Sequence, residues 1–278
     1  MHIFTFKKDL GRYLSTLSNN NTIGFIPTMG CLHEGHLRLI KKSKKKCSLT
    51  ICSIFINPTQ FDNINDLTNY PKKTNADIKK LKKVACDIVY VPEIHDLYTN
   101  EIKVKKFDFG TLVSTMEGKF RPEHFNGVAT IIEKLFTIIQ PTMAFFGEKD
   151  LQQLQIIKIL TQQINSPIEI VGVPTVREKN GLAKSSRNEL LSENEREEAA
   201  LINECLKYCK KNKSKGIAYL KNYIEQIFNE HVNLKLEYIE FVKITNMCSI
   251  TEWGEEKSNA VCIAAYINNI RLIDNIIL

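Results

Sequence analysis

The chain has 278 residues, a net charge of +7 at pH 7 and 43% hydrophobic residues, which predicts one or two domains that bury their cores without disulfide staples. Its eight cysteines are scattered, without a Cys-x-x-Cys pair or zinc-ligand spacing, which excludes a disulfide framework or zinc finger and favours reduced thiols. We find no secretory signal pattern and no apolar run that could span a bilayer, so we expect a soluble, cytoplasmic protein without a membrane partner.

Residues 22–36 contain the first strand pattern and the most informative motif. Residues 22–26 predict a short buried strand that Pro27 ends, and a helical pattern follows. His33 and His36 lie three residues apart in the motif PTMGCLHEGH, which places both imidazoles on one face of the first helical turn. The N–H groups and dipole of that turn favour an anion, so the pair could bind a triphosphate. Taken alone, the motif fits a helix cap with one partly buried histidine better.

A lysine cluster follows this helix, at positions 41, 42 and 44–46. Net positive charge can indicate nucleic acid, a membrane surface or an anionic small molecule. Lysines at a helix end also complement its dipole and stay solvated, and no aromatic residues alternate with them to stack on bases. We therefore expect no nucleic-acid partner, and at most weak steering of a polyphosphate.

Apolar strand patterns alternate with helical patterns through the first part of the chain. Residues 48–56, 87–91 and 142–146 predict buried strands, and an apolar stripe from Val128 to Ile139 predicts a helix. This alternation predicts an α/β domain over residues 1–175, with a doubly wound, Rossmann-like parallel sheet. Ligands bind such sheets beyond the carboxyl ends of the strands.

After about residue 175 the pattern changes to that of a smaller α+β domain, residues 176–278. Ser192 and Glu195 predict a capping box that opens a helix, and Ser214 is expected to cap another. Residues 235–244 and 260–278 alternate as strands, with a hairpin turn expected at positions 268 and 269. Cys205 and Cys209 are predicted to be packing residues rather than metal ligands.

Four further polar stretches accompany the histidine motif. They are SIFINPTQF at 53–61, RPEHFNG at 121–127, FFGEKDLQQL at 145–154, and VPTVRE at 173–178 with GLAKSSRN at 181–188. In this order and spacing they closely resemble the pantoate–β-alanine ligases, or pantothenate synthetases. This family shares the His-x-Gly-His nucleotide site with class I aminoacyl-tRNA synthetases. The resemblance is densest from Gly24 to about Arg196 and extends more loosely to the end of the chain.

The resemblance implies an ATP-dependent ligase with two half-reactions. The pantoate carboxylate attacks the α-phosphorus of ATP to give pantoyl adenylate and pyrophosphate, and the amine of β-alanine then displaces AMP to give pantothenate, a coenzyme A precursor. The resemblance also implies Mg²⁺ on the phosphates, with no protein ligand assigned to it, a homodimer, and a second domain that closes over ATP.

The resemblance further implies roles for individual residues. The implied catalytic residues are His33, His36, Lys149, Ser185, Ser186 and Arg187. The implied ATP-binding residues are Met29, Gly30, His36, Gly147, Lys149, Asp150, Val176, Lys184, Ser185, Ser186 and Arg187. Pantoate would be bound by Met29, Gln60 and Gln153, whereas Gln152 is expected to be solvated. Arg121 and His124 would line the site or cap the next helix, and Arg121 is a candidate for the β-alanine carboxylate.

Alternatives remain open for several residues and for the function. Lys149 could be a surface lysine paired with Glu148 or Asp150, and Arg187 could tie its loop to the sheet. Lys72, Glu123, Asn126 and Lys184 depart from the family pattern. The Lys184 ammonium would lie near the pyrophosphate or extend into solvent. A related adenylyl- or cytidylyltransferase that needs no amine, or a non-catalytic nucleotide or nucleic-acid binding protein, would also fit parts of the pattern.

Overall fold

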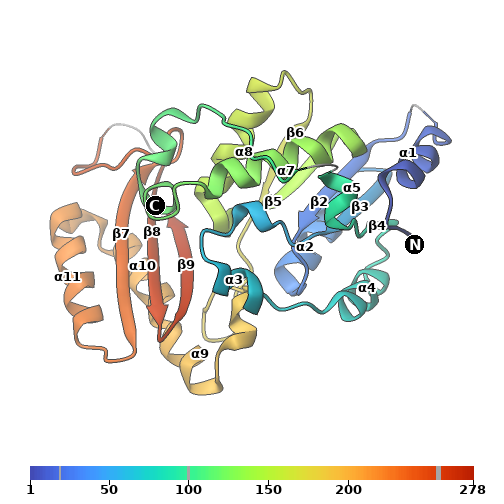
Figure 1. The fold of residues 1–278 in the computed structure, drawn as a ribbon. Helices are drawn as coiled ribbons and strands as arrows, with labels where there is room; N and C mark the ends of the chain where they lie inside the picture. The colour runs from blue at the N-terminus through green and yellow to red at the C-terminus, as the bar shows by residue number, and fades with distance from the viewer. Residues whose placement is uncertain (19, 99–100, 255–257) are drawn as a thin grey trace. The chain divides into compact units, whose positions relative to one another are not determined.

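The computed structural model describes residues 1–18, 20–98, 101–254 and 258–278 and divides the chain into two compact units (Figure 1). The first unit comprises Met1–Phe109, Arg121–Glu148 and Ile156–Pro174. The second comprises Gly110–Phe120, Lys149–Gln155 and Thr175–Leu278. The two short segments of the second unit precede its long segment in the sequence, and no sequence pattern predicted them.

A six-stranded parallel sheet forms the centre of the first unit, in the order β1-β4-β3-β2-β5-β6. The strands are β1 (His2–Phe4), β2 (Ile23–Thr28), β3 (Leu49–Ile54), β4 (Ile88–Tyr90), β5 (Met143–Gly147) and β6 (Glu169–Val173). Their short, nearly continuous apolar sequences suit strands that are covered on both faces. The prediction of a Rossmann-like parallel sheet is confirmed.

The helices that accompany the strands are mostly short. The α-helices are α1 (Lys7–Ser15), α2 (Glu34–Lys46), α3 (Ile64–Asn69), α4 (Thr74–Lys83), α5 (Ile94–Leu97), α6 (Met116–Phe120), α7 (His124–Ile139), α8 (Leu151–Gln163), α9 (Glu193–Ala199), α10 (Leu201–Lys211) and α11 (Ile217–Asn229). The 3-10 helices are η1 (Pro58–Gln60), η2 (Gly110–Val113), η3 (Glu148–Asp150), η4 (Ser186–Leu190) and η5 (Lys213–Lys215). None of the described helices is long and apolar enough to cross a membrane.

Helices cover both faces of the parallel sheet. On one face, Ile40 of α2 and Leu81 of α4 share a buried cluster with Ile26 of β2. The preceding residue of β2, Phe25, points to the opposite face, because side chains alternate along a strand. There it meets Phe136 of α7 edge-on, with ring centroids 6.3 Å apart. The sheet is therefore doubly wound, as the sequence predicted.

Pro27 does not end β2, so this detail of the sequence prediction is wrong. The strand continues to Thr28, and Pro27 lies opposite Ser53 of β3. On the other side, β2 pairs with β5 only at Gly24 and Phe25. Proline therefore occupies a part of the strand with a partner on one side, where its missing N–H is tolerated. The histidine motif begins at the end of this strand.

The second unit contains an antiparallel sheet of three strands, β7 (Leu234–Lys243), β8 (Asn259–Ile267) and β9 (Ile270–Ile277). The tight turn between β8 and β9 confirms the predicted hairpin. Helices α10 and α11 pack against this sheet (Figure 1) and share one apolar core with it. The capping box of Ser192 and Glu195 is present at α9. Ser214 does not cap α11, because it lies within η5 and Gly216 holds the N-cap position.

Candidate functional site

The two histidines form a reciprocal cap at the start of α2. His33 is the N-cap residue, and its Nδ1 accepts the backbone N–H of Gly35 at 3.1 Å. His36 lies in the first turn, and its Nδ1 accepts the backbone N–H of His33 at 3.3 Å. The rings lie side by side, with centroids 4.1 Å apart. Both histidines are half-buried.

This cap defines the chemistry that the imidazoles offer. Because a backbone N–H can only donate, each Nδ1 must accept, and in the neutral ring the proton therefore resides on Nε2. The Nε2–H group of each neutral ring can then act as a hydrogen-bond donor. Both rings stand at the N-terminus of α2, where the helix dipole also favours an anion. A helix cap and an anion-binding site, two alternative interpretations of the sequence motif, are thus compatible.

Gln60 occupies a polar niche formed by η1, the 3-10 helix after β3. Its side chain is nearly buried, its Nε2 donates to the Met29 sulfur at 3.1 Å, and its Oε1 accepts from Asn57 Nδ2 at 3.2 Å. Gln60 and Met29, both predicted to contact pantoate, are therefore in contact. Asn57 was not proposed as a site residue, although it lies three residues before Gln60.

Asn57 links the niche to its surroundings. It is 1% exposed, its Oδ1 accepts from the Tyr98 hydroxyl at 2.9 Å, and its Nδ2 also donates to the Gly127 carbonyl oxygen at 3.1 Å. Every polar atom of this buried amide side chain is hydrogen-bonded, as burial demands. Asn57 therefore fixes the amide end of Gln60.

Arg121 and His124 both bind the backbone carbonyl of Gln60. Arg121 Nη2 donates to this oxygen at 3.1 Å, and His124 Nδ1 lies 2.7 Å from it. The carbonyl can only accept, so His124 carries its proton on Nδ1. Arg121 Nε also donates to Asp62 at 3.2 Å. The N-cap residue of α7, Glu123, makes no side-chain cap bond. Arg121, which precedes α7, and His124, its first residue, therefore both hold the Gln60 backbone.

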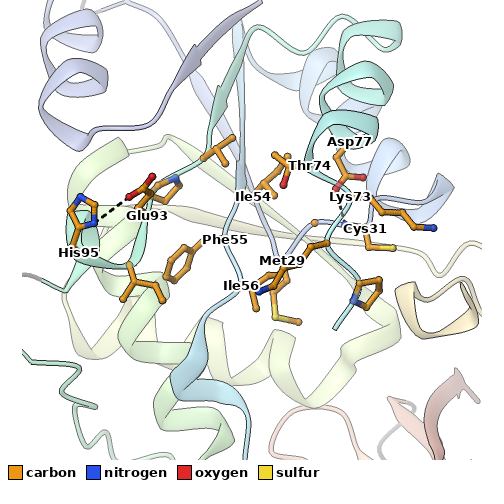
Figure 2. A pocket seen from close by; sticks show the side chains of 16 residues that line it. Met29, Cys31, Ile54, Phe55, Ile56, Lys73, Thr74, Asp77, Glu93 and His95 are labelled. Atoms are coloured by element: carbon orange, nitrogen blue, oxygen red, sulfur yellow. Dashed lines mark hydrogen bonds and ion pairs between the residues drawn. The ribbon is translucent and has the colours of Figure 1, made fainter. Parts of the chain in front are cut away.

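A pocket of about 470 Å³ lies beyond the carboxyl ends of β2, β3 and β4 (Figure 2). Its walls come from residues 29–31, from 54–56 at the end of β3, from 71–74 and Asp77 at the start of α4, and from 91–95 after β4. In its wall the Asp77 carboxylate is directed at Cys31. The pocket thus lies beside residues 29–31, in the loop that leads to the histidines.

In the second unit, Lys149 and Asp150 lie at the end of η3. Lys149 Nζ is 3.2 Å from Asp150 Oδ1, and the lysine side chain is only 16% exposed. The Lys149 carbonyl accepts from Asn275 Nδ2 at 2.8 Å, so strand β9 supports this turn. Lys149 therefore has the ion pair that the alternative interpretation required, but it is not a surface lysine.

Gln152 and Gln153 differ in surroundings, and one expectation about them is wrong. Gln152 is 4% exposed rather than solvated. Its Oε1 accepts from Glu117 N at 3.0 Å, and its Nε2 donates to Thr115 O at 3.0 Å and to Leu112 O. It anchors the segment Gly110–Phe120, which the sequence did not place beside it. Gln153 is half-buried, and its predicted contact with pantoate remains a prediction.

The segment from Val176 to Arg187 forms a folded loop in the second unit. Lys184 N donates to Val176 O at 2.9 Å, and Ser185 Oγ caps η4 through the backbone N–H of Arg187 at 3.2 Å. Lys184 Nζ lies 3.6 Å from Glu178 Oε1, so its ammonium has a carboxylate partner inside the same loop. Ser186 is nearly buried, and Arg187 is half-buried.

Arg177 anchors this loop to β9. Its guanidinium binds both oxygens of Asp274, at 2.5 and 3.1 Å. The Asp274 side chain is buried, and this desolvation raises its pKa even though Arg177 opposes the rise. Strand β9 therefore supports both predicted ATP-binding segments of this unit, because the next residue, Asn275, holds the Lys149 carbonyl.

The structure sorts the predicted site residues into two sets. The first unit contains Met29, Gly30, His33, His36, Gln60, Arg121, His124 and Gly147; the second contains Lys149, Asp150, Gln153, Val176, Lys184, Ser185, Ser186 and Arg187. A Cβ built on Gly147, at the end of β5, would meet no heavy atom within 4 Å, so space is open there. Within the described ranges, no three His, Cys, Asp or Glu residues cluster as metal ligands.

Comparisons with known proteins show which family the chain resembles over its whole length. The family model described as pantoate-beta-alanine ligase matches residues 2–277. The pantothenate synthetase of Christiangramia forsetii is 45% identical over 100% of this chain and 99% of its own length. That of Phocaeicola vulgatus is 44% identical over 97% of this chain and 96% of its own length.

Solved structures give the same result. The crystal structure of pantothenate synthetase from Thermus thermophilus superimposes with a TM-score of 0.92 at 31% identity and covers 99% of both chains. The pantoate-beta-alanine ligase from Francisella tularensis, complexed with beta-gamma ATP and beta-alanine, has a TM-score of 0.84 at 34% identity. That match covers 100% of this chain and 97% of the other.

Proposed function

The chain belongs to the pantoate-β-alanine ligase family, which forms a C–N bond, and from this we propose that it makes pantothenate through a pantoyl-adenylate intermediate. A carboxylate oxygen of pantoate attacks the α-phosphorus of ATP, and the bond to the β-phosphate breaks to release pyrophosphate. The amine of β-alanine then attacks the acyl carbon, loses a proton, and displaces AMP.

The protein's part in the first step is to position the reactants and neutralise charge. Pantoate already carries its nucleophile, so no side chain needs to become one. We propose that the Nε2–H groups of His33 and His36 donate to the phosphate oxygens of ATP, where negative charge grows as the pyrophosphate leaves. The reciprocal cap at the start of α2 is the observation that carries this proposal, because it fixes both donors on one helix end.

We propose that the residues of the second unit bind the same ATP molecule. Lys149, Ser185, Ser186 and Arg187 would bind phosphate oxygens, while Asp150, the Val176 backbone and Gly147 of the first unit would bind ribose and adenine. Lys184 has Glu178 as a partner at 3.6 Å, so in this proposal it acts on the pyrophosphate as half of an ion pair.

The Gln60 niche is proposed to bind pantoate. An amide can donate to a carboxylate or hydroxyl and accept from a hydroxyl, which suits a hydroxy acid. Met29 touches Gln60, and Gln153 of the second unit would complete the contacts. Arg121 and His124 hold the Gln60 backbone. Arg121 is also the proposed partner of the β-alanine carboxylate.

Mg²⁺ is proposed to enter with ATP as its counter-ion. Magnesium keeps water and phosphate ligands and needs few protein carboxylates. A homodimer, a cytoplasmic location and closure of the second domain over ATP remain predictions from the sequence.

A coupled assay tests the proposal. Purified protein with Mg²⁺, ATP, pantoate and β-alanine should release AMP and pyrophosphate, and omission of any one organic substrate should stop pantothenate formation. Exchange of labelled pyrophosphate into ATP should require pantoate but not β-alanine, because the adenylate forms before the amine reacts.

Three outcomes would contradict the proposal. Exchange that requires β-alanine would exclude a free adenylate step. Pyrophosphate release that needs neither pantoate nor β-alanine would favour another nucleotidyltransferase. Salt-sensitive RNA binding without ATP turnover would favour a non-catalytic binding protein.

A further inference from the structure

We propose that Asp77, which lies outside all the sequence motifs, is a positioning residue that holds the loop before His33 and His36 in the shape needed for adenylyl transfer. This inference rests on the proposed function, because Asp77 would support the residues that are proposed to bind the nucleotide. It concerns the loop from Met29 to Leu32, called here the histidine loop.

The Asp77 carboxylate clamps two successive backbone N–H groups of the histidine loop. Its Oδ2 accepts from Cys31 N at 2.7 Å and its Oδ1 accepts from Leu32 N at 2.8 Å, and the residue is 0% exposed. Figure 2 shows the carboxylate of α4 directed at Cys31. Hydrogen bonds to an ionised acceptor are short and strong, and the first turns of α4 favour the negative charge. Asp77 thus fixes the backbone immediately before His33.

A second side chain of α4 completes the clamp. Lys80 lies one turn after Asp77, and its Nζ donates to the Leu32 carbonyl oxygen at 2.5 Å. Helix α4 therefore binds both the N–H and the C=O of Leu32. These bonds orient the peptide units of Leu32, which lead into the N-cap residue of α2.

The histidine loop needs this clamp because its backbone is strained. Gly30 and Cys31 have φ values of +86° and +49°, so two successive residues are in the left-handed region. Glycine tolerates this conformation, but a residue with a side chain is disfavoured there. The loop also borders the pocket of about 470 Å³, which Met29, Gly30 and Cys31 help to line. The bonds to the Asp77 carboxylate then help to hold Cys31 in this conformation.

The consequence for catalysis follows from the chain order. His33 comes directly after Leu32, and His36 is tied to His33 by the reciprocal cap. If the loop relaxed toward an unstrained backbone, both Nε2–H donors would move relative to the phosphates. A misplacement of about 1 Å in an active site can lower a rate by about 100-fold.

The test uses the full-length protein and the variant Asp77→Asn. Asparagine keeps the shape of the side chain, but its Nδ2 donates and cannot accept, so one loop N–H loses its partner. We expect the turnover number for pantoate-dependent pyrophosphate–ATP exchange to fall by about 10- to 100-fold. Asp96→Asn is the matched control. Asp96 is also buried, and its Oδ2 accepts from Lys7 N and from the Tyr90 hydroxyl, neither of which belongs to the loop.

A double-mutant cycle distinguishes positioning from a loss of stability. If Asp77 acts through the histidines, Asp77→Asn should add little to the loss already caused by His36→Gln, because effects within one unit of function do not multiply. Any loss of exchange rate caused by Asp96→Asn should instead multiply with the loss caused by His36→Gln. A purely structural role of Asp77 would instead give multiplied losses.

The outcomes separate this inference from the proposed function. A wild-type protein without pantoate-dependent exchange would refute the function itself. If the wild-type protein shows exchange, two results would overturn the positioning role. One is an exchange rate of Asp77→Asn within about threefold of wild type, and the other is rate losses that multiply in the double-mutant cycle. If Asp77→Asn does not fold, Lys80→Met decides. If Lys80→Met lowers the exchange rate about threefold or more and adds little to the loss in His36→Gln, the clamp is supported. An unchanged exchange rate overturns it.

Discussion

At the scale of single residues, His33 and His36 combine two tasks that are usually separate. Each uses Nδ1 to accept a backbone N–H at the start of α2 and thereby directs its proton to Nε2. The cap thus selects the tautomer that can donate to a phosphate. A test of these residues must therefore separate the loss of the cap from the loss of the donor.

Substitution of the histidines should impair adenylation. His33→Ala or His36→Ala should lower pyrophosphate–ATP exchange by about 100-fold, because a donor to the transferring phosphates is lost. Alanine also removes a cap worth about 1 kcal/mol. His36→Gln keeps an acceptor at this position, as in a capping box, and should lose exchange without losing thermal stability. Near-wild-type exchange in His36→Gln would remove this ring from the catalytic set.

Gln60→Ala should weaken pantoate binding rather than abolish turnover. The substrate group that Gln60 contacts would be left unpaired in a nearly dry niche, so the KM for pantoate should rise by about 10- to 100-fold. Steady-state kinetics with saturating ATP and β-alanine measure this change. Gln162, which is exposed on α8, provides the control, and Gln162→Ala should leave the KM unchanged. An unaltered KM in Gln60→Ala would exclude it from the pantoate site.

At the scale of elements, the position of Gln60 depends on how closely α7 approaches η1. Gly127 of α7 faces the backbone of Thr59, and a Cβ at this position would lie 2.0 Å from the Thr59 carbonyl oxygen. Only glycine allows this approach, which also brings Arg121 and His124 to the Gln60 carbonyl. A helix and a short 3-10 turn thus build one half of the proposed pantoate niche.

Gly127→Ala should therefore damage both stability and binding. The methyl group would push α7 away from η1, at a cost of about 1–3 kcal/mol in the free energy of unfolding, and should raise the KM for pantoate. Denaturant unfolding and kinetics measure the two effects. Gly11→Ala, in α1, is the opposite control, because its Cβ meets no atom within 4 Å and alanine favours a helix. Equal stabilities of the two variants would disprove the close approach.

At the scale of the whole molecule, burial keeps most of the cysteine thiols away from solvent. Seven of the eight are buried, and Cys248 is half-buried. Burial raises the pKa of Cys86, Cys205 and Cys209 to about 12, so these thiols remain protonated at neutral pH. The predicted role of Cys205 and Cys209 in packing agrees with their place in the core of the second unit.

A thiol-reactive reagent should therefore detect few cysteines in the native protein. Because the thiolate is the reactive form and must be accessible, we expect rapid reaction of about one thiol, that of Cys248, at neutral pH. All eight should react after denaturation. Rapid native reaction of three or more thiols would mean that one of the cores opens readily, and Cys248→Ser should abolish the rapid phase.

The sequence by itself determined the kinds of elements and their chemistry. Apolar runs that suit strands covered on both faces predicted the parallel sheet. Residues 27–36 predicted a helix N-terminus that carries two imidazoles. The hairpin of β8 and β9 and the capping box at Ser192 also follow local rules that act over a few residues. Local physics of this kind is readable because each signal lies within one stretch of chain.

Only the tertiary structure decided which distant groups meet. The clamp of Asp77 on the histidine loop joins residues 45 and 46 positions apart, and neither partner carries a motif that announces it. Gln152, expected in solvent, is buried because the segment Gly110–Phe120 folds against it. Pro27 continues a strand because β5 has no pairing there. Such outcomes depend on which side of an element a remote segment covers, and periodicity along the chain does not contain that information.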